Sequence, residues 1–377
     1  MKRIIFFTKT NESKQALRSD INSVLLNLAS KNHVFIYDNK KCLFIDFNQK
    51  KEKSYKIKFL SSTRLYSISN FISFFIFLQM NKGEFDEIQI NYIREEYLFF
   101  PRLLKKLGKR MHLLVYGSDF YHRNWMRDRF NSIFYYADSI NFTNPTVLRA
   151  FNVFYNYKYE PKLNILDLPF EHFDLYRDFS LQEKINAKQQ LGIEKNKIVL
   201  AIGTNAFPFE QHEKIIIELE KLSNKNEYHL IFVFSYIGSD LSNRCSYLDQ
   251  LVSEKLFEFT FSIYKGYLSY SQISSIRLAT DCLINLRKTD QLVLSMLESN
   301  LAFSYIITGN WLPYDDYLQN VNANIIGEFS ELCNSIEEIT SIIKKGEGQL
   351  ILLNNRNYIL KRYSVTNAIQ KWHCLYD

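Results

Sequence analysis

Short apolar runs that alternate with longer helical stretches constrain the fold of this chain most. Five runs are mainly apolar and rich in β-branched or aromatic residues: Arg3–Phe7, His33–Tyr37, His112–Tyr116, Lys197–Ile202 and His229–Phe234. Runs of this length without polar alternation are typical of strands that are buried on both faces. Because helical stretches separate them, the sequence predicts an α/β fold with parallel sheets covered by helices on both faces.

Chain length and element order predict two such layers. The chain has 377 residues, which is enough for two domains of ordinary size. The segment 155–179 holds two prolines and many aromatic residues, and we expect it to be a linker. We therefore predict a Rossmann-like domain over 1–165, a second over 166–355, a cleft between them, and a C-terminal helix over 356–377 that packs back toward the first domain.

The two halves of the chain differ in charge. Residues 1–170 hold 27 Lys and Arg against 15 Asp and Glu, a net charge of +12, and residues 171–377 hold 20 against 25, or −5. A basic half favours an anionic partner such as a membrane surface or a phosphorylated lipid. Nucleic acid is not expected, since no known binding motif is present. The candidate membrane contacts, with solvated helix faces as the alternative, are Lys105, Lys106, Lys109, Arg110, Arg123, Arg127 and Arg129.

Cysteine and histidine spacing gives no sign of a metal site. The five cysteines are scattered without a CxxC pair, and no two histidines have metal-ligand spacing, so we expect reduced thiols in the cytoplasm and no metal. The N-terminal segment is too short for a signal peptide. The most apolar window, Leu65–Met80, is shorter than the roughly 20 residues that span a bilayer. It is expected to be a buried helix, with a membrane-surface helix as the alternative.

The stretch Cys282–Tyr317 combines a strand, a polar turn, a helix and a second strand, and it holds two carboxylates in its helical part. Asp290 begins the helix and Glu298 follows eight positions later. Eight residues are about 2.2 helical turns, so both side chains lie on nearly the same face. One carboxylate can accept from sugar hydroxyls and the other from ribose hydroxyls. The alternative is that Asp290 only caps the helix and Glu298 is a surface residue.

Strand ends in the second half offer further candidate ligand-binding residues. In open parallel sheets ligands gather at the carboxyl ends of strands, and helix N-termini favour phosphate. No Walker loop or GxGxxG motif is present, so ATP hydrolysis and hydride transfer lose support. The residues that we predict to bind a phosphate-containing ligand, which are called donor-binding residues below, are Gly203, Thr204, Asn205, His212, Tyr236, Gly238, Arg287, Lys288, Thr289 and Gln291.

The first half ends one strand in a similar way. His112–Tyr116 is followed by Gly117, Ser118 and Asp119. Asp119 is a candidate general base. His122, three residues later, is expected either to contact acceptor or donor or to lie on a helix surface.

Four segments resemble bacterial glycosyltransferases. Asp290-x7-Glu298 resembles the Glu-x7-Glu element of retaining glycosyltransferases with the two-Rossmann B-type fold (GT-B). Tyr116–Tyr121, Gly203–His212 and Asn310–Tyr314 are similar to segments of the lipid-linked N-acetylfucosaminyltransferase family of enterobacterial common antigen synthesis.

The resemblance implies sugar transfer from a nucleotide-diphosphate sugar to a lipid-linked or oligosaccharide acceptor in surface polysaccharide synthesis, such as O-antigen or capsule. It places Glu298 at the nucleotide ribose and Asp290 at the donor sugar. The basic pair that relatives carry after the first strand of the second domain is missing here, so Arg287 and Lys288 are expected to replace it. No cofactor is expected, because helix dipoles and basic side chains carry the leaving charge. The enzyme would work at the inner face of the cytoplasmic membrane.

Two other functions fit the same architecture. A sugar-nucleotide 2-epimerase would use the donor alone and need no lipid acceptor. A non-catalytic subunit of a glycan-assembly complex would bind without transferring, and polymer production would then survive loss of Glu298.

Overall fold

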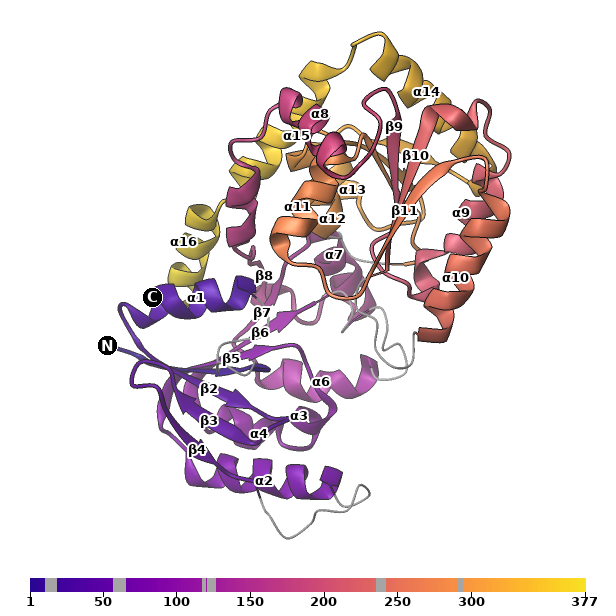
Figure 1. Ribbon diagram of the computed structural model, residues 1–377. Helices are drawn as coiled ribbons and strands as arrows, with labels where there is room; N and C mark the ends of the chain where they lie inside the picture. Colours follow the sequence, from indigo (N-terminus) through magenta and orange to yellow (C-terminus); the bar gives the residue numbers. More distant parts are fainter. Residues whose placement is uncertain (11–18, 57–65, 117–119, 121–126, 235–241, 290–293) are drawn as a thin grey trace. The chain divides into compact units, whose positions relative to one another are not determined.

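The protein forms two compact α/β units. The computed structural model (Figure 1) describes residues 1–377 except 11–18, 57–65, 117–119, 121–126, 235–241 and 290–293. Unit 1 comprises Met1–Glu171 and Tyr363–Asp377, and unit 2 comprises His172–Arg362. The divisions fall a few residues after the expected positions 165 and 355.

Unit 1 is built on an eight-stranded sheet with the order β4-β3-β2-β1-β5-β6-β7-β8. The strands from β2 to β8 in this order run parallel, while β3 and β4 are antiparallel to their neighbours. The strands are β1 (Arg3–Phe7), β2 (His33–Asp38), β3 (Leu43–Asp46), β4 (Lys51–Ser54), β5 (Phe85–Asn91), β6 (Gly108–Val115), β7 (Ser139–Phe142) and β8 (Leu163–Ile165).

Helices cover both faces of this sheet. In β1, Ile5 and Phe7 belong to one buried cluster and Ile4 and Phe6 to the other, because successive strand residues point to opposite faces. The first cluster includes residues of α2, α3, α4, α6 and α7, and the second includes residues of α1 and α16. The helices are α1 (Ser19–Ala29), α2 (Tyr66–Met80), α3 (Glu95–Phe99), α4 (Pro101–Lys105), α6 (Arg127–Tyr136), α7 (Pro145–Phe154) and α16 (Val365–Tyr376).

The expected linker 155–179 is wrong in its first half. Leu163–Ile165 pairs in parallel with β7 as the edge strand β8. Leu166 and Leu168, which follow it, are buried in the second cluster of unit 1. A three-residue edge strand is too short to show an alternating pattern, and the prolines on either side of it suggested an irregular segment.

Unit 2 is built on six parallel strands with the order β11-β10-β9-β12-β13-β14. The order reverses between β9 and β12, and open α/β sheets bind ligands at such a switch point. The strands are β9 (Ile198–Ile202), β10 (Tyr228–Phe234), β11 (Thr260–Lys265), β12 (Cys282–Asn285), β13 (Tyr305–Gly309) and β14 (Asn324–Ile326).

The helices of unit 2 are α8 (Leu181–Gln190), α9 (His212–Leu219), α10 (Ser242–Lys255), α11 (Tyr270–Ala279), α12 (Leu294–Leu301), α13 (Asp315–Leu318), α14 (Leu332–Lys344) and α15 (Gln349–Arg362). Helices α9, α10 and α14 share one hydrophobic core with the sheet. Helices α8 and α11 begin with capping boxes at Ser180 and Ser269, which fix where each helix starts.

The single C-terminal helix expected from the sequence is two helices, α15 in unit 2 and α16 in unit 1. Trp372 of α16 is fully buried, its indole N–H donates to the Asp167 carbonyl over 3.0 Å, and its ring stacks on Phe6. The expectation that the last helix packs against the first domain is therefore confirmed.

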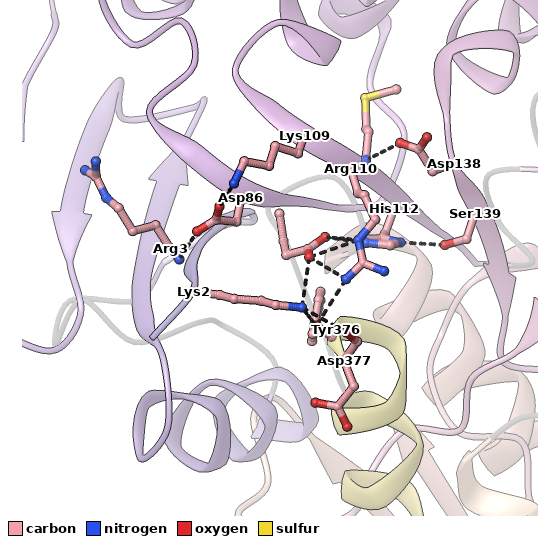
Figure 2. A network of polar contacts seen from close by, with 12 residues as sticks. Lys2, Arg3, Asp86, Lys109, Arg110, His112, Asp138, Ser139, Tyr376 and Asp377 are labelled. Carbon is pink, nitrogen blue, oxygen red and sulfur yellow. Dashed lines mark hydrogen bonds and ion pairs between the residues drawn. The ribbon is translucent and has the colours of Figure 1, made fainter.

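A buried polar network fastens the end of α16 at the amino-terminal ends of β5 and β6 (Figure 2). Glu87 accepts from Arg110 Nη2 at 2.5 Å and lies 2.9 Å from His112 Nε2, while Arg110 Nη2 also donates to the Tyr376 carbonyl over 3.1 Å. Burial alone would raise the pKa of Glu87, but the bonds from His112 and Arg110 outweigh it and hold that pKa below its usual value. Glu87 is therefore ionised, and its carboxylate holds Arg110 and His112 in the network that fixes the end of α16.

Candidate active site

Gly203 follows β9 at the carboxyl edge of the unit 2 sheet, next to β12. Its φ is +63°, and its N–H donates to the Ile284 carbonyl over 3.2 Å. A Cβ atom at this position would lie 2.7 Å from His212 Nε2 and 3.1 Å from Glu210 Oε2. Glycine is required here for two reasons, because L side chains disfavour this backbone conformation and because both neighbours approach the main chain closely.

A buried ion pair joins the segment after β9 to the segment after β12. Arg287 Nη2 lies 3.1 Å from Glu210 Oε1, and the Thr204 hydroxyl donates to the same carboxylate oxygen over 2.8 Å. The guanidinium carbon of Arg287 lies 4.5 Å from the centre of the Phe209 ring, within the range of a cation–π contact. Arg287 is only 7% exposed. The Glu210 carboxylate, which pairs with it, compensates this buried charge.

Hydrogen bonds to main-chain carbonyls tie the same two segments together. The Lys288 N–H donates to the Phe209 carbonyl over 2.7 Å, and the Gln211 side-chain amide donates to the Leu286 carbonyl over 2.8 Å. The Trp311 indole N–H donates to the Arg287 carbonyl over 2.8 Å. Lys288 itself is exposed. The arrangement places the exposed Lys288 on a hydrogen-bonded turn at the sheet's switch point.

His212 opens α9 and is fully buried beside Gly203. Burial, and then the positive charges of Arg244 and Arg287, lower its pKa to about 3. The imidazole is therefore neutral at physiological pH. Neither ring nitrogen has a hydrogen-bond partner among the described residues.

Glu298 lies inside unit 2, in the middle of α12, and is 4% exposed. Its carboxylate oxygens lie 3.2 Å from His172 Nε2 and 3.3 Å from Arg277 Nε. The His172 ring stacks on Tyr270, with centroids 4.3 Å apart and planes 11° apart. The alternative of a surface glutamate is therefore wrong, since a buried carboxylate is stable only when it is paired in this way.

The structure brings together seven of the predicted donor-binding residues around the ends of β9 and β12: Gly203, Thr204, Asn205, His212, Arg287, Lys288 and Thr289. The Asn205 amide donates to the Thr204 hydroxyl oxygen over 3.2 Å, and its carbonyl oxygen accepts from the Phe207 N–H over 2.9 Å. Six further predicted residues lie outside the described part of the chain: Asp119, His122, Tyr236, Gly238, Asp290 and Gln291.

Sequence reasoning assigned no individual role to five residues of this region: Phe209, Glu210, Trp311, His172 and Arg277. Glu210 lies in the segment Gly203–His212, whose resemblance was noted, and the structure shows it to be the buried counter-ion of Arg287. His172 and Arg277 are the partners of the Glu298 carboxylate. No local pattern marks these residues, because their partners lie far away in the sequence.

A cavity of 430 Å³ in unit 2 opens beside the other end of the strands, between Lys188, Lys197 and Lys344. Lys188 pairs with Asp281 at 2.5 Å, and Lys344 pairs with Glu227 at 2.6 Å. The cavity contains none of the predicted donor-binding residues. Within the described ranges, no cluster of three His, Cys, Asp or Glu residues could hold a metal ion.

Comparisons with known proteins show the fold. No protein-family model and no curated protein matches the sequence. HepE from Anabaena, solved in complex with UDP, matches with a TM-score of 0.73 and 13% identity over 98% of each chain. A glycosyltransferase from Rickettsia africae matches with a TM-score of 0.72 and 13% identity over 100% of this chain and 97% of its own.

Sucrose-phosphate synthase from Thermosynechococcus elongatus matches with a TM-score of 0.74 and 12% identity over 100% of this chain and 98% of its own. This chain shares their fold. The predicted α/β class with two Rossmann-like units is thereby confirmed.

Proposed function

We propose that this protein is a glycosyltransferase that moves a sugar from a nucleotide-diphosphate sugar to a glycan acceptor. The observation that carries the proposal is the built site at the switch point of unit 2, where Gly203, the Arg287–Glu210 pair and Lys288 meet. HepE, which has the same fold over nearly the whole chain, has been solved with UDP and with UDP-glucose.

In the proposed reaction the acceptor hydroxyl attacks the anomeric carbon while the bond from that carbon to the diphosphate breaks. Negative charge then develops on the leaving diphosphate, and a preorganised cation there lowers the barrier. Lys288 supplies that cation, because the charge of Arg287 is balanced by Glu210. Arg287 positions the turn that carries Lys288. The transfer needs no metal under this proposal.

Glu298 is the proposed partner of the nucleotide ribose, and Asp290 is the proposed partner of the donor sugar. Arg277 and His172 hold the Glu298 carboxylate in one orientation, so it can accept from ribose hydroxyls without reorganising. Asp119 is the proposed general base of an inverting course, and His122 is a proposed contact of the acceptor or the donor.

The proposed acceptor is a lipid-linked glycan of bacterial surface polysaccharide synthesis, met at the inner face of the cytoplasmic membrane. The Tyr116–Tyr121 and Asn310–Tyr314 segments support this through their similarity to a family with a lipid-linked acceptor. No helix in the described part of the chain is long and apolar enough to cross a membrane.

Thermal unfolding with UDP, GDP, dTDP and CMP tests the proposal. A ligand present at 100 times its Kd stabilises the folded state by about 2.7 kcal/mol, so one nucleotide is expected to raise the Tm clearly. Lys288→Ala should weaken that shift, while Lys345→Ala, an exposed lysine at the end of α14, should not. If no nucleotide raises the Tm, the proposal fails.

Product analysis separates the proposed transfer from epimerisation. Donor incubated with acceptor should give a longer glycan and free nucleoside diphosphate. Conversion of the donor sugar with donor alone would instead show a sugar-nucleotide epimerase.

A further inference from the structure

Helix α2 of unit 1 has an apolar outer face. Tyr66–Met80 contains no charged residue, although surface helices normally turn charged residues outward. The exposed fractions of its outer side chains run from 36% for Ile76 to 61% for Met80. At helical spacing the exposed residues form one stripe, and they are Ile68, Ile72, Phe75, Ile76 and Met80.

The stripe lies on the side of α2 opposite the helix's buried residues. Phe74, Phe77 and Leu78 on the inner side of α2 are buried in the core against Phe7 and Tyr37. The outer side chains point away from that core. Apolar surface of this kind on a folded protein marks an interaction site.

The stripe continues onto the next helix. Phe71 lies 5.4 Å from Phe99 of α3 and 4.7 Å from Phe100, measured between ring centroids. Phe75 also contacts Phe100, at 5.5 Å. Phe99 is 68% exposed. We call the stripe on α2 together with Phe99 the apolar strip.

Exposed lysines lie beside the C-terminal half of α2. Tyr55 packs on Phe77 at 5.2 Å, and the Lys53 ammonium lies 5.1 Å from the centre of the Tyr55 ring. After the helix comes Lys82, and the N–H of the next residue, Gly83, donates to the Lys106 carbonyl over 2.8 Å. Lys53, Lys82 and Lys106 are all exposed. Of the nearby carboxylates, Glu84 pairs with Arg3 at 2.8 Å, and Glu52 lies on β4 beside Lys53.

Three of the seven basic residues that the sequence singled out form ion pairs within unit 1, while Arg123 lies outside the described residues. Lys105 pairs with Asp138 at 2.5 Å, Lys109 with Asp86 at 2.7 Å, and Arg110 with the buried Glu87. Because a carboxylate compensates each of these charges, the three residues contribute little attraction for an anionic surface. Lys106 is not among these pairs, and its carbonyl accepts from the N–H of Gly83, three residues after the end of α2.

We propose that the apolar strip is a membrane-docking surface, which enters the boundary between headgroups and acyl chains while Lys53, Lys82 and Lys106 contact anionic headgroups. Uncharged apolar side chains with lysines at the margin have the composition of helices that lie in a bilayer interface. Attraction by lysine to anionic lipid complements the burial of the apolar side chains. The inference rests on the proposed function only for the lipid-linked acceptor that such docking would serve.

Vesicle co-sedimentation of the full chain, without nucleotide, tests the proposal. The protein should bind phosphatidylcholine vesicles containing phosphatidylglycerol and bind pure phosphatidylcholine vesicles more weakly. Ile72→Gln with Ile76→Gln should weaken binding about tenfold or more, because both apolar side chains leave the interface. Ile217→Gln, which changes an exposed isoleucine of α9 in unit 2, should leave binding unchanged.

The charge component has its own pair of variants. Lys82→Glu with Lys106→Glu should lower affinity for the anionic vesicles at least about fivefold per lysine, while Lys345→Glu should have no effect. Circular dichroism and Tm establish that each variant is folded. If neither the strip variant nor the lysine variant weakens vesicle binding, the proposal is overturned. So does dimerisation of the wild type in sedimentation velocity that Ile72→Gln abolishes, since the strip would then cover a second copy.

This test is independent of the nucleotide test. If vesicles bind but no nucleotide raises the Tm, the docking surface stands and the proposed activity fails. If a nucleotide binds but the vesicles do not, the opposite holds.

Discussion

Arg287 and Glu210 form a buried ion pair, with Nη2 and Oε1 3.1 Å apart, between two segments that lie far apart in the sequence. The segment after β9 supplies the carboxylate and the segment after β12 supplies the guanidinium. Their pairing sets the distance between the two turns that we assign to the donor diphosphate. Arg287 therefore holds the two turns together, and the exposed Lys288 beside it is the residue that we assign to the ligand.

Breaking this pair should destabilise unit 2. Arg287→Met leaves the Glu210 carboxylate buried without its counter-ion, and we expect a loss of about 3–5 kcal/mol in the free energy of unfolding. Adding Glu210→Gln should recover part of that loss, because the buried charge is gone. Urea denaturation measures both. Lys288→Met, at an exposed position, should stay within about 0.5 kcal/mol of wild type. Full additivity of the two buried changes would contradict this account.

Gly203→Ala should cost more than an ordinary substitution at positive φ. The new Cβ would meet His212 Nε2 at 2.7 Å, in addition to the backbone cost of about 1–2 kcal/mol. Gly192, with a φ of +73° and no atom within 4 Å of a built Cβ, is the matched control that pays the backbone cost alone. Thermal unfolding of the two variants should place Gly203→Ala clearly lower. Equal Tm values would show that the His212 contact yields without cost.

Stability should fall on acidification below neutrality, partly through His212. Its pKa is about 3 in the folded protein and 6.5 by its ordinary value. Between these pH values the unfolded chain binds a proton that the folded protein does not. Stability is therefore full above pH 6.5 and falls by about 1.4 kcal/mol per pH unit toward pH 3, or about 2 kcal/mol at pH 5.

Urea denaturation of wild type and His212→Phe at pH 7 and pH 5 isolates this contribution. The difference between the two pH values should shrink in the variant. It should not vanish, because burial also lowers the pKa of His229, to about 4. An unchanged difference would mean that His212 does not resist protonation in the fold.

Glu298→Gln should lower activity by more than its loss of folded protein explains. The amide can still accept a hydrogen bond, but Arg277 loses its buried counter-ion, and we expect a cost of about 1–3 kcal/mol in unfolding free energy. If the carboxylate contacts the ribose as proposed, kcat/KM should fall by at least about tenfold at a temperature where the variant is fully folded. Glu258→Gln, whose carboxylate pairs with Lys225 on the surface, provides the control. Activity that follows folded fraction alone would assign Glu298 a structural role.

The buried strands and their order of appearance could be predicted because their composition alone decides them. Lys197–Ile202 and His229–Phe234 are apolar runs that are typical of buried strands. Both form interior strands of the unit 2 sheet. The strand β4 (Lys51–Ser54) is fully exposed and reads KEKS. It is a strand only because β3 offers an open edge, and sequence pattern carries no trace of that.

The site divides in the same way. Gly203 was found from the glycine that ends a strong strand, a local signal. Glu210 and His172 were not, because their roles depend on partners 77 and 126 positions away, Arg287 and Glu298. The ion pairs of Lys109 and Arg110 likewise depend on strand neighbours brought together by the sheet. A net charge calculated from the sequence does not show that these residues form ion pairs in the fold.

The division of the chain between the units has a consequence during translation. Unit 2 is inserted into unit 1, since Tyr363–Asp377 returns to the first sheet. Trp372 and Tyr376 complete a core whose other side was synthesised first, with Ile4 and Phe6. On the ribosome, that face of unit 1 stays open while unit 2 is synthesised, because α16 is made after all of unit 2. A chaperone that shields this face would therefore act throughout the synthesis of unit 2.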